Sequence, residues 1–283
     1  MHVELAEQRV LMLADRFSMD HAEGRAWTRR IDAFGTLARL GGLLSRPRDE
    51  EFETVYCERR FQPFWHIACT ASFEYERERS YRVPVDAQVR SVVQDGVTRA
   101  IDGGAFTIRA TEHCREEIAR ESLNDAIRGT PNAALARYLD ADAAVVTPET
   151  LAHQAGEGAV IVPPEAKASV LVREVLANSI ARIEADRVID ERLTLRHVDL
   201  YYRPVYAFRY RWQGKEAVVE FDGVTGEVST GGATFEALAG RPLDGRFLLN
   251  VGVEAAGLFI PGARLAEMVV SRGIEMARRE PER

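Results

Sequence analysis

Two segments of the chain alternate apolar and polar residues with the period of a half-buried β-strand. After Pro63, every second residue from Trp65 to Tyr75 belongs to one row of mostly apolar side chains. After Pro204, every second residue from Tyr206 to Trp212 is aromatic. Because successive strand residues point to opposite faces, the pattern predicts two strands that each bury one such row.

The same two segments match each other. Phe61 to Trp65 reads FQPFW and Tyr202 to Tyr206 reads YRPVY, with equivalent positions 141 residues apart. Proline has no amide hydrogen and favours a strand start or edge, so we expect a separate strand before each proline, at about 51–58 and 192–201. Turns at 76–79 and 213–215 would connect each strand after the proline to a following antiparallel strand. The matched strings therefore predict an internal repeat of two antiparallel meanders.

A helical pattern precedes each meander. Apolar residues recur every three or four positions from Trp27 to Leu44, and again from Val172 to Ile183. A helix of this kind can cover one face of a sheet. The predicted fold class is α+β: two tandem helix-plus-antiparallel-meander units with extra helices, divided into residues 1–142 and 143–283.

The extra helices are predicted from their end signals. Residues 111–128 form a candidate helix that stops at Gly129. Thr130-Pro131 and Thr147-Pro148 each read as an N-cap followed by a first-turn proline, and the helix after Thr130 should reach about Tyr138. Residues 246–279 are expected to form two helices separated by Pro261.

One stretch of the second unit resembles a known family. Residues 217–228 read AVVEFDGVTGEV, in which Asp222-Gly223 and Gly226 provide positions for a tight turn. This resembles the closing hairpin of PepSY-type domains, in which antiparallel strands follow a helix, and the similarity lies mainly within residues 164–228. The resemblance implies a binding or regulatory module, often associated with peptidases, and it implies no catalytic residues.

Composition places few limits on function. The chain has 283 residues, 37 basic and 44 acidic, for a net charge of −7, which argues against a general phosphate-binding surface. Three cysteines do not suit a disulfide framework, and charged residues interrupt the first apolar stretch before a signal-peptide core could form. No apolar run is long enough to cross a membrane. We expect a cytoplasmic protein.

A zinc site is the first chemistry to test, because five potential ligands recur in the first half: Cys57, His66, Cys69, His113 and Cys114. His66 and Cys69 are three positions apart on a predicted strand, so they face opposite sides. The spacing favours a core thiol at Cys69 and an imidazole on the other face. We therefore predict no metal and no cofactor.

Other polar residues could serve a ligand or a reaction. His113 and Glu117 lie one turn apart on the predicted helix and could orient a proton carrier, although an exposed helix face also explains them. With His153, they could line a cleft between the two units. No phosphate-loop, nucleophile-elbow or zincin signature occurs in the chain.

Three function classes remain. Duplication without a shared polar site favours a non-catalytic binding, regulatory or scaffold protein that acts through protein contacts, with a protein partner or a homodimer. The first alternative is a small-ligand-binding protein or enzyme that uses the cleft, its ligand undefined. The second is a single-stranded nucleic-acid binder that uses Arg209 and Arg211, which the predicted burial of the neighbouring rings disfavours.

Overall fold

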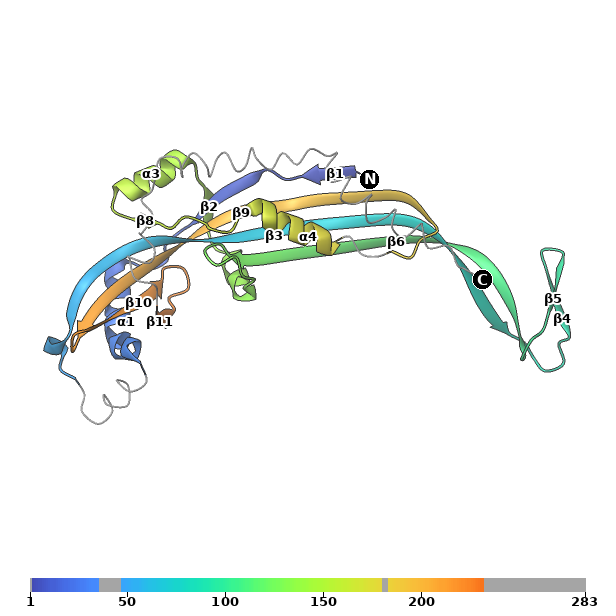
Figure 1. Ribbon diagram of the computed structural model, residues 1–283, viewed down its shortest axis with the longest axis horizontal. Helices are drawn as coiled ribbons and strands as arrows, with labels where there is room; N and C mark the ends of the chain where they lie inside the picture. The colour runs from blue at the N-terminus through green and yellow to red at the C-terminus, as the bar shows by residue number, and fades with distance from the viewer. Residues whose placement is uncertain (1, 36–46, 180–182, 232–283) are drawn as a thin grey trace.

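The computed structural model describes residues 2–35, 47–179 and 183–231. One long, curved sheet of nine strands dominates these residues, and only short helices lie against it (Figure 1). The predicted fold class is therefore wrong, because the described part is predominantly β. The two matched strands pair with each other, so their hairpins belong to a single sheet and do not form two tandem α+β units.

Three long strands build the sheet: β3 (Glu53–Pro84), β6 (Ala105–Asp125) and β9 (Arg187–Trp212). β3 lies between the other two and is antiparallel to both. Residues 77–84 of β3 and 105–112 of β6 extend past the end of β9 as a two-stranded arm (Figure 1). A small separate hairpin, β4 (Ser91–Gln94) and β5 (Val97–Ala100), lies at the tip of this arm.

Shorter strands complete both edges. β9 pairs with β1 (His2–Leu5) and β2 (Gln8–Leu13) in parallel and with β10 (Lys215–Asp222) in antiparallel orientation. β7 (Ala143–Val145) pairs with β2, β11 (Val228–Thr230) pairs with β10, and β8 (Val160–Ile161) pairs with β3. Gln213 and Gly214 have positive φ in the predicted β9–β10 turn, which is confirmed.

The two proline motifs pair with each other, antiparallel, inside the sheet, at a point that we call the crossing. Gln62 lies directly opposite Arg203, and Phe61 lies opposite Pro204. The prediction that each proline starts or borders a strand is wrong, since both lie within long strands. The carbonyl of Pro63 accepts the Ala126 amide on the edge away from β9. The missing amide hydrogen therefore removes no bond between β3 and β9.

The turns after β6 and β10 are built alike. The Asp125 and Asp222 side chains each accept two amides, two and three residues further along the chain. Four residues after each aspartate, Gly129 and Gly226 have φ near +70° and donate to the aspartate carbonyl. This conformation favours glycine, which explains why the turn ends on that residue in both places.

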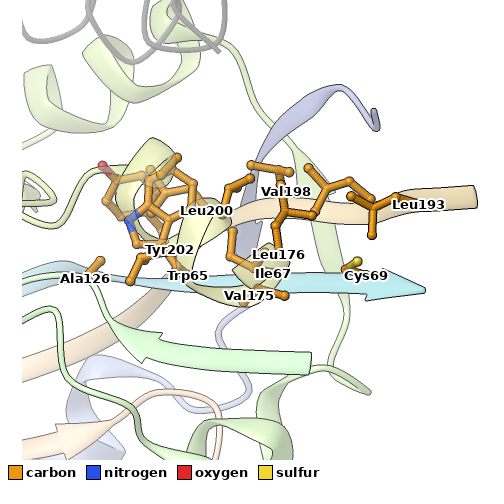
Figure 2. Close-up of a cluster of buried hydrophobic side chains, with 14 of the residues drawn as sticks. Trp65, Ile67, Cys69, Ala126, Val175, Leu176, Leu193, Val198, Leu200 and Tyr202 are labelled. Carbon is orange, nitrogen blue, oxygen red and sulfur yellow. The ribbon is translucent and has the colours of Figure 1, made fainter. Parts of the chain in front are cut away.

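Two helices cover the apolar rows of the matched strands. α4 (Ala168–Ser179) packs on Trp65, Ile67 and the rest of the first row, in the core shown in Figure 2. α1 (Met19–Arg29) and the 3-10 helix η1 (Arg30–Phe34) cover the row that begins at Tyr206. The predicted burial of both rows is thus confirmed, apart from Trp212, which is only partly buried.

The remaining helices are short: α3 (Pro148–Gly156) and the 3-10 helices η2 (Asp49–Glu51) and η3 (Ala133–Tyr138). Thr147 caps α3 and Pro148 begins it, as its sequence predicts. η3 has Asn132 as its cap instead of Thr130. Part of the first predicted helix and all of 246–279 lie outside the described residues. None of the described helices is long and apolar enough to cross a membrane.

Two local predictions in the first half are wrong. Residues 111–128 are not a helix, because 111–125 belong to β6, where they pair with β3 residue by residue. The expected turn at 76–79 is also strand, since β3 continues to Pro84. Backbone pairing along this whole length overrides the helical propensity of the Glu, Arg and Ala residues.

Candidate functional site

The candidate site lies on the sheet face opposite α4, which we call the polar face. Along β3 it carries the even-numbered side chains from Gln62 to Glu74, because these alternate with the row that α4 covers. Near its centre, Phe64 packs against both Tyr138 of η3 and Tyr201. Polar side chains lie on both sides of this small apolar cluster.

A cluster of two histidines and an aspartate lies beside Tyr201. His66 of β3 is opposite Asp199 of β9, and Ala68 is opposite His197. His66, His197 and Asp199 therefore emerge on one face from two neighbouring strands. The imidazole rings stack with centroids 4.9 Å apart, and the His197 Nδ1 lies 3.1 Å from the Asp199 Oδ2.

Charged neighbours hold this cluster from both sides. Arg9 of β2, which lies opposite Asp199, donates from Nε to Oδ1 at 2.8 Å and from Nη2 to Oδ2 at 2.6 Å. Glu121 of β6 lies 2.7 Å from the His66 Nε2. The Asp199 side chain is almost fully buried, so these contacts replace the hydrogen bonds that water would give its oxygens.

His66 has an unusual electrostatic environment. Burial lowers its pKa below the ordinary value of 6.5, and this effect exceeds the opposing attraction of Glu121. The ring is therefore neutral near pH 7. Its Nδ1 atom is buried, has no hydrogen-bond partner among the described residues and lies 3.9 Å from the Asp199 Oδ2. One nitrogen from each histidine and one carboxylate oxygen lie within 4.8 Å of one another, which is a set that could hold a metal ion.

Further along the polar face, an open groove of about 470 Å³ crosses the three long strands. Its charged residues alternate in sign, with Arg115 beside Glu117 on β6 and Arg192 beside Asp190 on β9. Such a lining suits polar contacts with a ligand of mixed charge better than it suits a polyanion.

On the other side of Tyr138, a buried ionic network surrounds the crossing of the motifs. Arg203 donates to Asp222 at 2.6 Å and to the Tyr138 hydroxyl at 2.9 Å. Burial alone would raise the pKa of Asp222, but Arg203 and the hydrogen-bond donors outweigh it, so the pKa lies below its ordinary value. Arg60, which is fully buried, forms ion pairs with Glu58 and Glu220. Both arginines of this network thus have carboxylate partners within the chain, so we assign the network a structural role.

The sequence-predicted residues do not converge on one cleft. His113 and Glu117 lie on the exposed face of β6, where His113 faces Glu76 at 3.3 Å and Glu117 pairs with Arg115. His153 lies on α3 and faces Glu157 at 3.5 Å. Within the described parts of the chain, no hydrogen bond or ion pair joins His153 to the other two.

The two candidate nucleic-acid residues are already engaged. Arg209 pairs with Glu216, and Arg211 pairs with both Glu216 and Glu53. The aromatic rings of Tyr206, Phe208 and Tyr210 on the same strand are buried under α1 and η1, so they offer no stacking surface for bases.

The residues considered for zinc in the sequence lie apart. Cys69 is buried in the core under α4, as predicted, while His66 lies on the opposite face. Cys57 is exposed, yet burial of its sulfur and nearby carboxylates raise its pKa to about 11. The sequence reasoning missed Arg9, Glu121, His197 and Asp199. The matched motifs contain a signal for the last two: if they cross with Gln62 opposite Arg203, then His66 must lie opposite Asp199.

A scan against protein-family models, a search of curated proteins and a search of solved structures found no match.

Proposed function

We propose that this chain is a non-catalytic binding or scaffold protein that acts through protein contacts, and that it pairs with a second copy of itself along β6. The observation that carries the proposal is the outer edge of this strand. Among the described residues, β6 pairs only with β3, so its other edge offers a long row of backbone groups between 107 and 121. Such an edge is a template for another strand.

The direction of the backbone groups defines which residues would pair. The Leu123 carbonyl accepts the Asn132 amide and the Asp125 amide donates to the Thr130 carbonyl, both on the side away from β3. The backbone groups of odd-numbered residues of β6 therefore point outward. From Arg115 to Glu121, these outward groups have no partner within the described residues.

The side chains along this edge are self-complementary in one antiparallel register. When Ile118 lies opposite Ile118 of the second copy, Glu116 faces Arg120 and Arg115 faces Glu121, and each pair occurs twice because of the two-fold symmetry. No like charges are opposed between 113 and 123. Opposite charges directly across a strand pair stabilise it, and like charges destabilise it.

Neighbouring registers are less favourable. A shift of the dyad to Glu117 places Glu117 opposite itself, and a shift to Ala119 places Glu117 opposite Glu121. Charged side chains usually protect an edge from unwanted pairing. Here the order of charges along β6 places like charges opposite each other in the shifted registers but not in the register centred on Ile118. The same charges can therefore select a specific partner.

Three other observations are compatible with this role. The resemblance of 217–228 to PepSY-type hairpins supports a binding module over a catalytic one. The in-register crossing at Gln62 and Arg203 and the two alike turns support an internal repeat. The free cysteines are compatible with the reducing conditions of the cytoplasm, where we expect this role.

Sedimentation velocity over a wide range of protein concentration tests the proposal with a charge swap. Glu116 and Arg120 are exposed, and they are about 13 Å apart along one strand, so they do not pair within a chain. We expect the wild type to dimerise, Glu116→Arg and Arg120→Glu each to weaken dimerisation, and the double variant to restore it.

The control is Arg109→Glu, an exposed change on the same strand but outside the paired segment. It should leave dimerisation unchanged. A wild type that stays monomeric at every concentration would overturn the proposal. So would a dimer that is insensitive to both single swaps, because it would use another surface or another part of the chain.

A further inference from the structure

We propose that His66, His197 and Asp199 form a binding site for a divalent transition-metal ion such as Zn²⁺. The site does not depend on self-association through β6.

The first argument is the unpaired nitrogen of His66. Only 8% of this side chain is exposed, and its Nδ1 atom has no hydrogen-bond partner in the described parts of the chain. A buried polar atom without a partner is costly and therefore requires an explanation. This one lies close to the carboxylate of Asp199, so a bound cation would satisfy it.

The second argument is the geometry of the three ligand atoms. A tetrahedral zinc site with bonds of about 2.0–2.1 Å has neighbouring ligand atoms roughly 3.4 Å apart. The Asp199 Oδ2 lies 3.1 Å from the His197 Nδ1 and 3.9 Å from the His66 Nδ1, which brackets that value. Two imidazoles and one carboxylate are a ligand set that suits zinc and its neighbours in the first transition row, and they leave a position for water or another ligand.

The third argument is the support behind His66. Metal-bound histidines usually donate their other ring N–H to a carboxylate, which fixes the tautomer and the ring orientation. Glu121 accepts such a bond from the His66 Nε2 at 2.7 Å, so the lone pair of Nδ1 is free for a metal.

Arg9 is the group that opposes a cation. Its Nη2 atom lies 2.6 Å from the Asp199 Oδ2 and 3.2 Å from the His197 Nδ1, so it occupies the side of the carboxylate that a metal would use. The Arg9 side chain is 45% exposed and can swing toward solvent. Metal and guanidinium therefore compete for Asp199, and removal of Arg9 should strengthen metal binding.

Titration of the full-length chain with Zn²⁺, read by competition with a chromophoric chelator, tests this site. We expect one ion per chain, with affinity that falls in acid because an imidazole must be unprotonated to bind a metal. His66→Gln and His197→Gln should each weaken binding by roughly 100-fold or more, and Arg9→Gln should strengthen it. His113→Gln and His153→Gln, at two exposed histidines, are the matched controls and should not change it.

Substitution with Co²⁺ gives an independent readout. A site with two nitrogens and an oxygen should give the visible absorption of tetrahedral Co²⁺, and His197→Gln should abolish it. His197 is partly exposed, so this variant should fold even if the buried His66 does not tolerate replacement. Absence of Zn²⁺ binding by the wild type would overturn the proposal, as would binding that survives both histidine replacements or is lost in the His113 or His153 control.

Discussion

Arg203 donates from Nη2 to the Gln62 Oε1 at 2.7 Å across the β3–β9 pair, and the two residues occupy the same position in the two matched strings. The sheet therefore has a local two-fold relationship at this point. The equivalent aspartates after the neighbouring strands, Asp125 and Asp222, extend the relationship to two turns with the same hydrogen bonds. Only the second aspartate also pairs with the arginine at the crossing.

Replacement of this arginine should destabilise the whole sheet. In Arg203→Met, the buried Asp222 loses its cationic partner, so we expect a loss of about 3–5 kcal/mol in the free energy of unfolding. Urea denaturation measures it. Arg196→Met, at an exposed arginine on the same strand, should change stability by less than about 0.5 kcal/mol. Equal effects of the two substitutions would contradict a structural role for the crossing.

The two alike turns should differ in their tolerance of alanine. Both Gly129 and Gly226 have positive φ, which alone costs alanine about 1–2 kcal/mol. A Cβ atom at Gly226 would also lie 2.9 Å from the Phe17 ring, whereas at Gly129 the nearest atom is 3.5 Å away. Gly226→Ala should therefore lower the thermal midpoint more than Gly129→Ala does. The reverse order would show that Phe17 does not pack on this turn.

His66 should make stability depend on pH. Its pKa in the folded chain is lower than 6.5, so the unfolded chain binds its proton more readily. The resulting stability is present above pH 6.5 and is lost as the pH falls through the folded pKa. Unfolding measured with a chelator present should show this loss in the wild type and much less of it in His66→Gln. The same loss in both proteins would assign it to other groups, and His113→Gln is the control.

The β6 edge can be blocked without removing a bond to β3. The amide of Ala119 points outward, so Ala119→Pro removes only a group available to a partner, and proline is tolerated on edge strands. We expect this variant to fold and to remain monomeric in sedimentation experiments. Arg120→Pro, one residue later, removes a bond to β3 and should unfold part of the arm, visible as lost strand signal in circular dichroism. A dimeric Ala119→Pro variant would argue against strand pairing.

The predictable part of the fold was local. The alternation from Trp65 to Tyr75 and from Tyr206 to Tyr210 is a property of each segment alone, and so are the cap and proline that begin α3. These features predict the buried rows and the start of α3. The covering helices are predicted less well, because α4 covers the first row and α1, which begins before the predicted range, covers the second. The composition of residues 111–128 predicts a helix, and only pairing with β3 makes most of them a strand.

The site required information that no single segment carries. His66 and Asp199 are far apart in the sequence, and they meet because β3 and β9 cross in register. The match between Phe61–Trp65 and Tyr202–Tyr206 predicts two separate units, whereas the structure pairs the two strings in one sheet. Arg9 and Glu121 reach the cluster from two further strands, so their part in it follows only from the order of strands in the sheet.

Disulfide trapping at Ile118 tests the proposed pairing most directly. In the register given above, this residue faces itself across the two-fold axis as a non-hydrogen-bonded pair, with Cα atoms about 4.5 Å apart, which is within the range that a disulfide spans. In a Cys57→Ser and Cys114→Ser background, mild oxidation of Ile118→Cys should produce a covalent dimer, and Glu116→Cys alone should not. A mixture of Glu116→Cys and Arg120→Cys should produce a mixed dimer. Failure of Ile118→Cys to crosslink, or equal crosslinking at Glu116→Cys, would contradict the account.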